Sequence, residues 1–265
     1  MRIVVPIKQV PETGNVRMDE ETGTVIRQGA ESIVNPLDLY SIELAIRLKE
    51  KYGGQITAVS MGPPAAVEAL KEAIAMGIDS AILISDASFA GSDTWATSFV
   101  LSEAIKKIAD YDLIICGERA TDGDTGQVGP GIAAFLDLPV ISYVSSFERI
   151  EDNRCTVSRM VEAGYEVLSC PMPLLLTVVK EISDPRLPTL GGKLRSRQID
   201  IPVWDSKILG IQPDMVGLKG SPTRVIKISK PQLTRQCRLA CAIDDQTAND
   251  SADKFLSYLN ERELV

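Results

Sequence analysis

Strand-like and helix-like segments alternate over the first 140 residues, and this alternation constrains the fold more than any other feature. β-Branched and aliphatic runs typical of buried strands occupy residues 2–7, 55–61, 80–85 and 112–117. Apolar residues at helical spacing fill the intervals, and they predict helices from Pro36 to Gly53 and over 65–76, 93–109 and 131–136. Repeated units of this kind require a parallel sheet with right-handed crossovers and helices on both faces. The predicted fold class is therefore α/β.

The sequence changes in character after residue 140. Strand-like segments without helices between them predict antiparallel hairpins that extend the sheet: 140–147, 155–161, 165–169 and 174–179. From Ser183 proline and glycine are frequent, which predicts either an arm packed on something other than the core or a solvated surface loop. An amphipathic helix is expected over 251–264, with Phe255, Leu256 and Leu259 on its apolar face. The predicted organisation is a core over 1–183, an arm over 184–235 and a tail over 236–265.

The chain contains no histidine among its 265 residues. This excludes Ser-His-Asp and Cys-His catalysis and histidine metal sites, so redox or acid–base chemistry needs carboxylates, backbone groups or a bound cofactor. The net charge of −8 argues against binding to nucleic acid or anionic membranes. Cys237 and Cys241 alone make a poor metal site, and no signal peptide or membrane-spanning run is visible. We expect a cytoplasmic protein without membrane insertion.

The strongest local signal is the loop after the strand over 112–117. Its glycines at 123, 126 and 129 follow the spacing GxxGxxG, which is neither the dinucleotide fingerprint nor a Walker loop. Glycine-rich backbone before a helix presents free N–H groups to an anion such as pyrophosphate, and Thr125 and Gln127 add side-chain donors. A plain capped turn explains the loop equally well. Asp122 and Asp124 are candidates for ribose hydrogen bonds or helix capping, with hard-metal ligation as an alternative.

Two more strand-to-helix junctions carry candidate site residues. In Asn35-Pro36-Leu37-Asp38, Asn35 is expected to cap the helix that Pro36 begins. The second junction is Met61-Gly62-Pro63-Pro64. Ligands of parallel sheets bind beyond the carboxyl ends of the strands, so these junctions and the glycine loop are expected to rim one pocket.

Several of these motifs together resemble the β subunit of electron-transfer flavoproteins. They are Val4-Val5-Pro6-Ile7-Lys8-Gln9-Val10-Pro11-Glu12-Thr13, Asn35-Pro36, Val59-Ser60-Met61-Gly62-Pro63 and the run from Asp122 to Pro130. A further signature of that family covers Val157 to Thr177 and departs from the family pattern at Ala163, where Gly or Asp is usual. The resemblance covers nearly the full chain.

The resemblance implies an αβ heterodimer. Its β subunit would have a Rossmann-like, adenine nucleotide α-hydrolase-like parallel sheet extended by antiparallel strands, and a C-terminal arm that wraps the α subunit. The β pocket holds AMP in the simple type and FAD in the bifurcating type, and the run from Asp122 to Pro130 looks like the bifurcating type. In that type NADH reduces the β-site FAD. One electron then passes through the α-subunit flavin to a partner dehydrogenase, and the other goes to ferredoxin or flavodoxin.

The resemblance also assigns residues. The nucleotide-site positions are Pro6, Asn35, Asp38, Met61, Asp122, Gly123, Asp124, Thr125, Gly126, Gln127, Val128, Gly129 and Pro130, with Thr94 and Thr97 as flavin-ring contacts. Leu190 is expected to dock the partner dehydrogenase, whose substrate is an acyl-CoA, an enoyl-CoA or a 2-hydroxy acid. No residue of the chain is expected to be catalytic, because the flavin carries the chemistry. Two alternatives stay open: a simple electron carrier with structural AMP, and a non-redox adenine-nucleotide-binding protein of the same fold.

Overall fold

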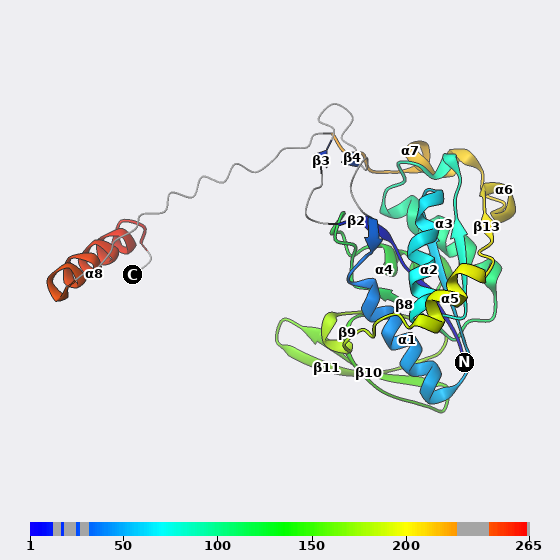
Figure 1. The fold of residues 1–265 in the computed structure, drawn as a ribbon, viewed down its shortest axis with the longest axis horizontal. Helices are drawn as coiled ribbons and strands as arrows, with labels where there is room; N and C mark the ends of the chain where they lie inside the picture. The colour runs from blue at the N-terminus through cyan, green and yellow to red at the C-terminus, as the bar shows by residue number, and fades with distance from the viewer. Residues whose placement is uncertain (13–16, 19–24, 27–31, 227–243, 264–265) are drawn as a thin grey trace. The chain divides into compact units, whose positions relative to one another are not determined.

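The computed structural model describes residues 1–12, 17–18, 25–26, 32–226 and 244–263. The chain divides into two compact units, residues 1–226 and residues 227–265, and we call the first of these the core unit (Figure 1). Thr13, Cys237 and Cys241, which the sequence singled out, lie outside the described residues.

The described part of the core unit is built on a nine-stranded sheet in the order β11-β10-β9-β12-β8-β1-β6-β7-β13. Its central strands are parallel: β1 (Arg2–Pro6), β6 (Gln55–Met61), β7 (Ser80–Ile84), β8 (Leu113–Gly117) and β12 (Leu174–Val178). The first four match the four predicted strands. The spatial order β7-β6-β1-β8 is the 3-2-1-4 order of a Rossmann-like sheet, so the predicted fold class is confirmed.

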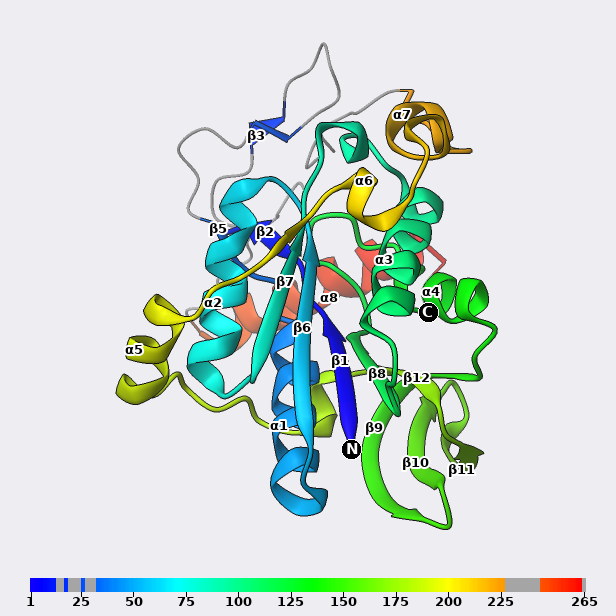
Figure 2. The same cartoon turned by 90° about the vertical axis from the view of Figure 1, so that its right-hand side faces the viewer.

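Helices cover both faces of this sheet, as predicted. Figure 2 shows α1 (Asp38–Tyr52) and α2 (Val67–Met76) on one side, and α3 (Thr94–Ile108) and α4 (Val128–Leu136) on the other. Successive side chains along the strands point to opposite faces of the sheet and belong to two separate apolar clusters, one under each pair of helices. One detail of the prediction is wrong, because the helix expected from Gly131 begins at Val128.

The antiparallel extension is confirmed for β9 (Val140–Glu151), β10 (Arg154–Val161) and β11 (Gly164–Pro171), which pair in sequence order. It is wrong for the segment predicted over 174–179, because β12 runs parallel to both β8 and β9 and lies between them. The reason lies in its residues: all five positions of β12 are buried, and such continuous apolar runs are typical of parallel strands covered on both faces.

The stretch after Ser183 contributes α5 (Leu190–Gln198), β13 (Val203–Trp204), α6 (Ser206–Leu209) and α7 (Gly217–Gly220) to the core unit. The expectation that it packs away from the core is wrong for α5 and β13. Helix α5 packs against α2, and β13 pairs with β7 at the edge of the sheet. A glycine makes the close helix contact possible, since a Cβ at Gly192 would lie 2.0 Å from the Ala75 carbonyl oxygen. The predicted boundaries near residues 183 and 235 stay predictions.

Short strands complete the core unit, in which β2 (Gln9–Pro11) pairs with β5 (Ser32–Val34), and β3 (Arg17–Met18) with β4 (Val25–Ile26). In the second unit, α8 (Asp245–Asn260) begins six residues before the predicted helix, because Asp244 and Thr247 form a capping box there. The apolar residues Phe255 and Leu256 of α8 are exposed. Among the described residues, no helix has the length and apolar character needed to cross a membrane.

Candidate functional site

The carboxyl ends of β1, β6, β7 and β8, with the loops and helix starts that follow them, form what we call the carboxyl edge. Most of the predicted site residues come together here. Pro6 ends β1 and Met61 ends β6, while Thr94 and Thr97 lie in the first turns of α3. The loop from residue 118 to 127 follows β8 and leads into α4, whose first three residues are Val128, Gly129 and Pro130.

Asn35 joins two parts of the carboxyl edge that are 84 residues or more apart in sequence. Its side-chain amide donates to the carbonyl of Arg119 at 2.9 Å, and its amide oxygen accepts from the backbone N–H of Thr121 at 3.1 Å. The expectation that Asn35 caps the next helix is therefore wrong, since α1 has Leu37 at its N-cap and no side-chain cap. Asn35 is fully buried and fixes the start of the glycine loop instead.

Asp38, the first residue of α1, connects the ends of β1 and β8. Its carboxylate accepts from the backbone N–H of Lys8 at 2.7 Å, and it lies so near Gly117 that a Cβ there would be 2.5 Å from Oδ1. Burial away from water raises the pKa of Asp38 to about 7, although hydrogen bonds from Lys8 and Asn35 oppose that rise. The position thus keeps part of this carboxyl group protonated up to near-neutral pH.

The two aspartates of the loop have cationic partners. Asp122 pairs with Lys8 at 2.7 Å, and Asp124 pairs with Arg119 at 3.1 Å. The described residues contain no group of three or more Cys, Asp or Glu side chains that could hold a metal ion. Lys8 also places a cation at the end of β1, which the sequence did not single out.

The three positions of the loop are occupied by glycine for different structural reasons. Gly126 has φ +63°, a left-handed conformation that side chains with a Cβ adopt at a cost. Gly129 faces the sheet, because a Cβ there would lie 2.8 Å from Cγ2 of Thr177 on β12. Gly123 has no atom within 4 Å of the place that a Cβ would take. The space beside Gly123 is therefore open to a ligand, whereas Gly129 is explained by packing.

The start of α4 offers backbone donors to an anion. The N-cap residue Gln127 provides no side-chain cap, so the N–H groups of the first turn are left to other partners. Pro130 lies in that turn and carries no N–H group. Proline is tolerated there, because the N–H groups of a first helical turn have no partner within the helix. Partial positive charge at a helix N-terminus favours phosphate, and this end of α4 directly follows the glycine loop.

A cavity of about 300 Å³ lies between the start of α3 and helix α4. Its lining includes Thr94, Trp95, Ser98, Gln127, Gly131 and Phe135. The Thr94 hydroxyl donates to the Gln127 side-chain oxygen at 2.9 Å, and the Trp95 and Phe135 rings meet edge-to-face with centroids 4.8 Å apart. The two helices approach closely because residue 131 is glycine: a Cβ there would lie 2.4 Å from the Ser98 hydroxyl. Sequence reasoning missed Trp95, Ser98 and Phe135. A tryptophan in the first turn of a helix beside a glycine loop was the available signal.

Leu190 lies away from the carboxyl edge. It is the first residue of α5, and the Thr189 before it caps that helix by accepting from the Gly192 N–H at 2.9 Å. The Thr189 N–H in turn donates to the carbonyl of Ala75 at the C-terminal end of α2. Leu190 is 78 % exposed, and Leu194, one turn later on the same helix face, is 54 % exposed.

Comparison with known proteins agrees with this architecture. The electron transfer flavoprotein domain matches residues 22–209. The chain is 42 % identical to the caffeyl-CoA reductase-Etf complex subunit CarD of Acetobacterium woodii and 43 % identical to the electron transfer flavoprotein subunit beta of Thermoanaerobacterium thermosaccharolyticum, with both chains covered in full each time. It is 43 % identical to protein FixA of Azotobacter vinelandii over 88 % of this chain and 85 % of that protein.

The fold, the glycine loop at the carboxyl edge and these relatives agree with one another. The chain belongs to the electron transfer flavoprotein family, on its β-subunit side.

Proposed function

We propose that this chain binds FAD at the carboxyl edge as the β subunit of a bifurcating electron transfer flavoprotein. The complex would take electrons from NADH. It would divide them between ferredoxin or flavodoxin and, through the α-subunit flavin, a partner dehydrogenase. The observation that carries the proposal is the uncapped start of α4, placed behind a glycine loop with open space at Gly123 and beside an aromatic cavity.

The residues present fit a dinucleotide better than a bare anion. The first N–H groups of α4 and the open backbone at Gly123 suit a pyrophosphate, because they offer donors and partial positive charge without a side chain in the way. Asp122 and Asp124, as acceptors, suit ribose hydroxyls and would repel phosphate. The cavity beside Thr94, Trp95 and Gln127 has the polar and aromatic lining that a planar ring system requires.

When bound, FAD would supply the redox chemistry, since its ring accepts two electrons from NADH and releases them one at a time. The protein supplies position and charge. Lys8 and Arg119 neutralise the loop aspartates, which limits repulsion of the anionic cofactor. Asn35 and Asp38 hold the loop against β1 and α1, so the backbone donors are in place before the cofactor binds.

The relatives and helix α5 support the proposed partners. One relative is named as a subunit of a caffeyl-CoA reductase-Etf complex, which supports a CoA-ester dehydrogenase as partner and an α subunit as companion. We assign docking of that dehydrogenase to residues 184–198, called the docking segment below. Its exposed Leu190 suits an apolar pocket on the partner.

The test is the nucleotide content of the purified αβ heterodimer. Cofactors released by acid and separated by chromatography should comprise two FAD molecules per heterodimer and no AMP. One FAD with one AMP would instead assign the chain to the simple carriers, because AMP can use the same phosphate-binding loop. A heterodimer with AMP and without flavin would show a non-redox nucleotide-binding protein.

A further inference from the structure

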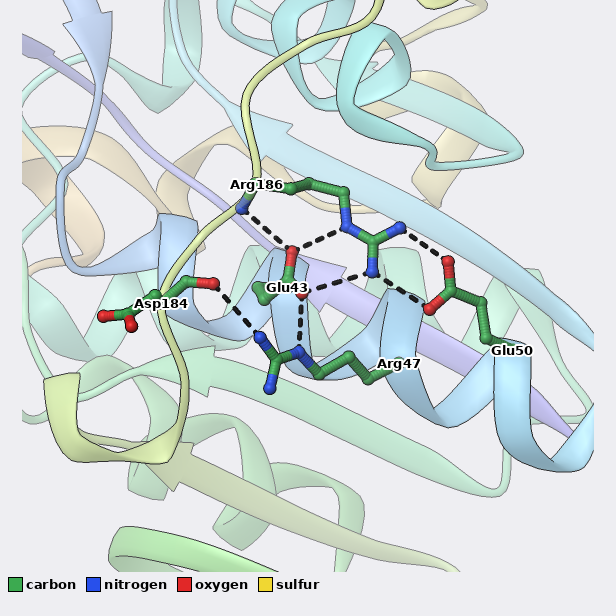
Figure 3. Close-up of polar contacts among 5 residues, drawn as sticks. All are labelled: Glu43, Arg47, Glu50, Asp184 and Arg186. Atoms are coloured by element: carbon green, nitrogen blue, oxygen red, sulfur yellow. Dashed lines mark hydrogen bonds and ion pairs between the residues drawn. The ribbon is translucent and has the colours of Figure 1, made fainter.

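A buried glutamate on α1 receives an arginine from the docking segment. Glu43 is only 1 % exposed, and Arg186 donates to its Oε2 from both the backbone N at 3.1 Å and Nε at 2.8 Å. Nη2 of Arg186 adds a bond to Oε1 of Glu43 at 3.2 Å (Figure 3). The other edge of the guanidinium donates to the carboxylate of Glu50, two turns further along α1, with hydrogen bonds of 2.6 and 3.0 Å.

Arg47 completes this cluster, which we call the Glu43 clamp. Its Nε donates to Glu43 Oε1 at 2.7 Å, and its Nη2 donates to the carbonyl of Asp184 at 3.3 Å. Burial by itself would raise the pKa of Glu43, but the hydrogen bonds from Arg186 and Arg47 outweigh burial and hold that pKa below its usual range. The clamp is thus ionised, balanced in charge and bound to the docking segment at both Asp184 and Arg186.

A second fixed point follows three residues after Arg186. The Thr189 N–H donates to the Ala75 carbonyl, and Gly192 allows α5 to touch the same end of α2. Arg195 then donates to the carbonyls of Ile78 and Asp79. Leu190 therefore projects from a backbone that is held on α1 before it and on α2 after it.

Stability alone does not explain a clamp of this chemistry. A buried ion pair gives about as much stability as apolar side chains of the same size, or less. Its distinctive property is geometry, because a guanidinium that binds two carboxylates through both edges fixes the direction of the chain that carries it. We infer that Arg186, held by Glu43 and Glu50, is a positioning residue that sets Leu190 in place for the partner dehydrogenase. This inference rests on the docking role proposed above.

The experiment compares variants of the αβ heterodimer with the dehydrogenase that co-purifies with the wild-type complex. Arg186→Met removes the clamp, and Arg186→Lys keeps the positive charge without the paired N–H donors of the guanidinium. Glu50→Gln weakens only the exposed half, so it serves if Arg186→Met does not fold. Arg2→Met is the matched control, because Arg2 forms an exposed ion pair with Asp110 at 2.8 Å elsewhere in the core unit. The readouts are the half-saturating dehydrogenase concentration, the maximal rate, flavin content and peptide-level hydrogen exchange.

We expect Arg186→Met to raise the half-saturating concentration about tenfold, since Leu190 must then be ordered at the moment of docking. The maximal rate and flavin content should stay at the wild-type level. Exchange should accelerate in peptides covering 187–198 and not in those covering α4. Arg186→Lys and Glu50→Gln should give smaller increases of about two- to threefold, and Arg2→Met none.

Leu190→Ala separates this inference from the function on which it rests. If Leu190→Ala weakens docking while Arg186→Met and Glu50→Gln leave the half-saturating concentration unchanged, the clamp does not position Leu190. A lower maximal rate or lost flavin in Arg186→Met, without a change in half-saturation, would show a merely structural role and also overturn the inference. If Leu190→Ala itself has no effect, the proposed docking role fails, and the inference fails with it.

Discussion

Helix α1 carries two buried carboxylates five residues apart, and their surroundings differ. Asp38 lies among hydrogen-bond donors at the carboxyl edge, and burial raises its pKa to about 7. Glu43 receives the guanidinium groups of Arg47 and Arg186, which keep its pKa low in spite of burial. The same helix thus organises the proposed cofactor site through a carboxyl group that burial keeps partly protonated up to near-neutral pH, and the docking segment through one that is ionised.

The difference suits the two regions. A negative charge at Asp38 would add to Asp122 and Asp124 near an anionic cofactor, whereas a neutral carboxyl group holds the backbone without that repulsion. The docking segment has no such ligand. It needs strong directional contacts, because its leucines are exposed and contribute nothing to the core that would hold them. Substitutions that affect one region and leave the other intact test this division.

The largest expected effect on binding concerns the carboxyl edge and leaves the docking segment intact. Gly123→Val fills the open space at the loop, so binding of the β-site nucleotide should weaken by about a hundredfold, the size of an overpacking cost of ~3 kcal/mol. Purified heterodimer should then hold one flavin of two, as measured by absorbance. Gly126→Val is a poorer test, because its φ of +63° would strain the loop itself.

Gly191→Val is the matched control, since Gly191 also has no atom within 4 Å of a Cβ but lies in the docking segment. It should retain both flavins. Full flavin content in Gly123→Val would mean that the loop does not hold the cofactor.

Leu190→Ala tests the opposite case, in which docking weakens and cofactor binding does not change. Loss of an apolar anchor typically costs about 1–3 kcal/mol, so docking of the dehydrogenase should weaken roughly 5- to 150-fold. Flavin content and reduction by NADH should not change, because Leu190 lies on α5 and not at the carboxyl edge. Leu218→Ala, at a 69 % exposed leucine elsewhere in the core unit, should leave docking unchanged. Equal effects of the two substitutions would remove the special role of Leu190.

Asp38→Asn tests the difference between the two carboxylates through the pH dependence of the free energy of unfolding. Because folding raises the pKa of Asp38 from 3.8 to about 7, its contribution to stability is fully present below pH 3.8 and lost as pH rises to about 7. Over that window the wild type should lose about 1.4 kcal/mol per pH unit relative to Asp38→Asn. Denaturant unfolding of both heterodimers at several pH values measures the difference. Asp137→Asn, at an exposed position, should track the wild type, and a parallel profile for Asp38→Asn would show an ionised Asp38.

The smallest expected effect concerns Leu194. It shares a helix face with Leu190 but is less exposed, so Leu194→Ala should weaken docking by about threefold at most. Titration with the dehydrogenase measures this effect beside that of Leu190→Ala. A larger loss for Leu194→Ala than for Leu190→Ala would move the anchor one turn along α5.

Much of the fold could be predicted from the sequence, because strand and helix patterns are local. The four parallel strands, the helices between them and the loop at Gly123 and Gly126 all followed from periodicity and glycine spacing. The role of Asn35 could not be predicted, since its partners Arg119 and Thr121 are distant in sequence and a capping side chain explains Asn-Pro equally well.

The Glu43 clamp also required the structure, although one signal was present. Glu43 interrupts the apolar run from Ile42 to Ile46, and a buried charge needs a partner. Nothing local identifies that partner as Arg186, which is 143 residues away. Strand β12 was misassigned for a similar reason: a hairpin follows from proximity in sequence, while its parallel pairing with β8 depends on tertiary burial.

Anaerobic titration with NADH tests the central claim most directly. The heterodimer should show bleaching of the β-site flavin on addition of NADH. The Gly123→Val heterodimer should keep its α-subunit flavin and lose this response. Absence of bleaching in the wild type, or equal bleaching in Gly123→Val, would contradict the assignment of an NADH-reducible flavin to the carboxyl edge of this chain.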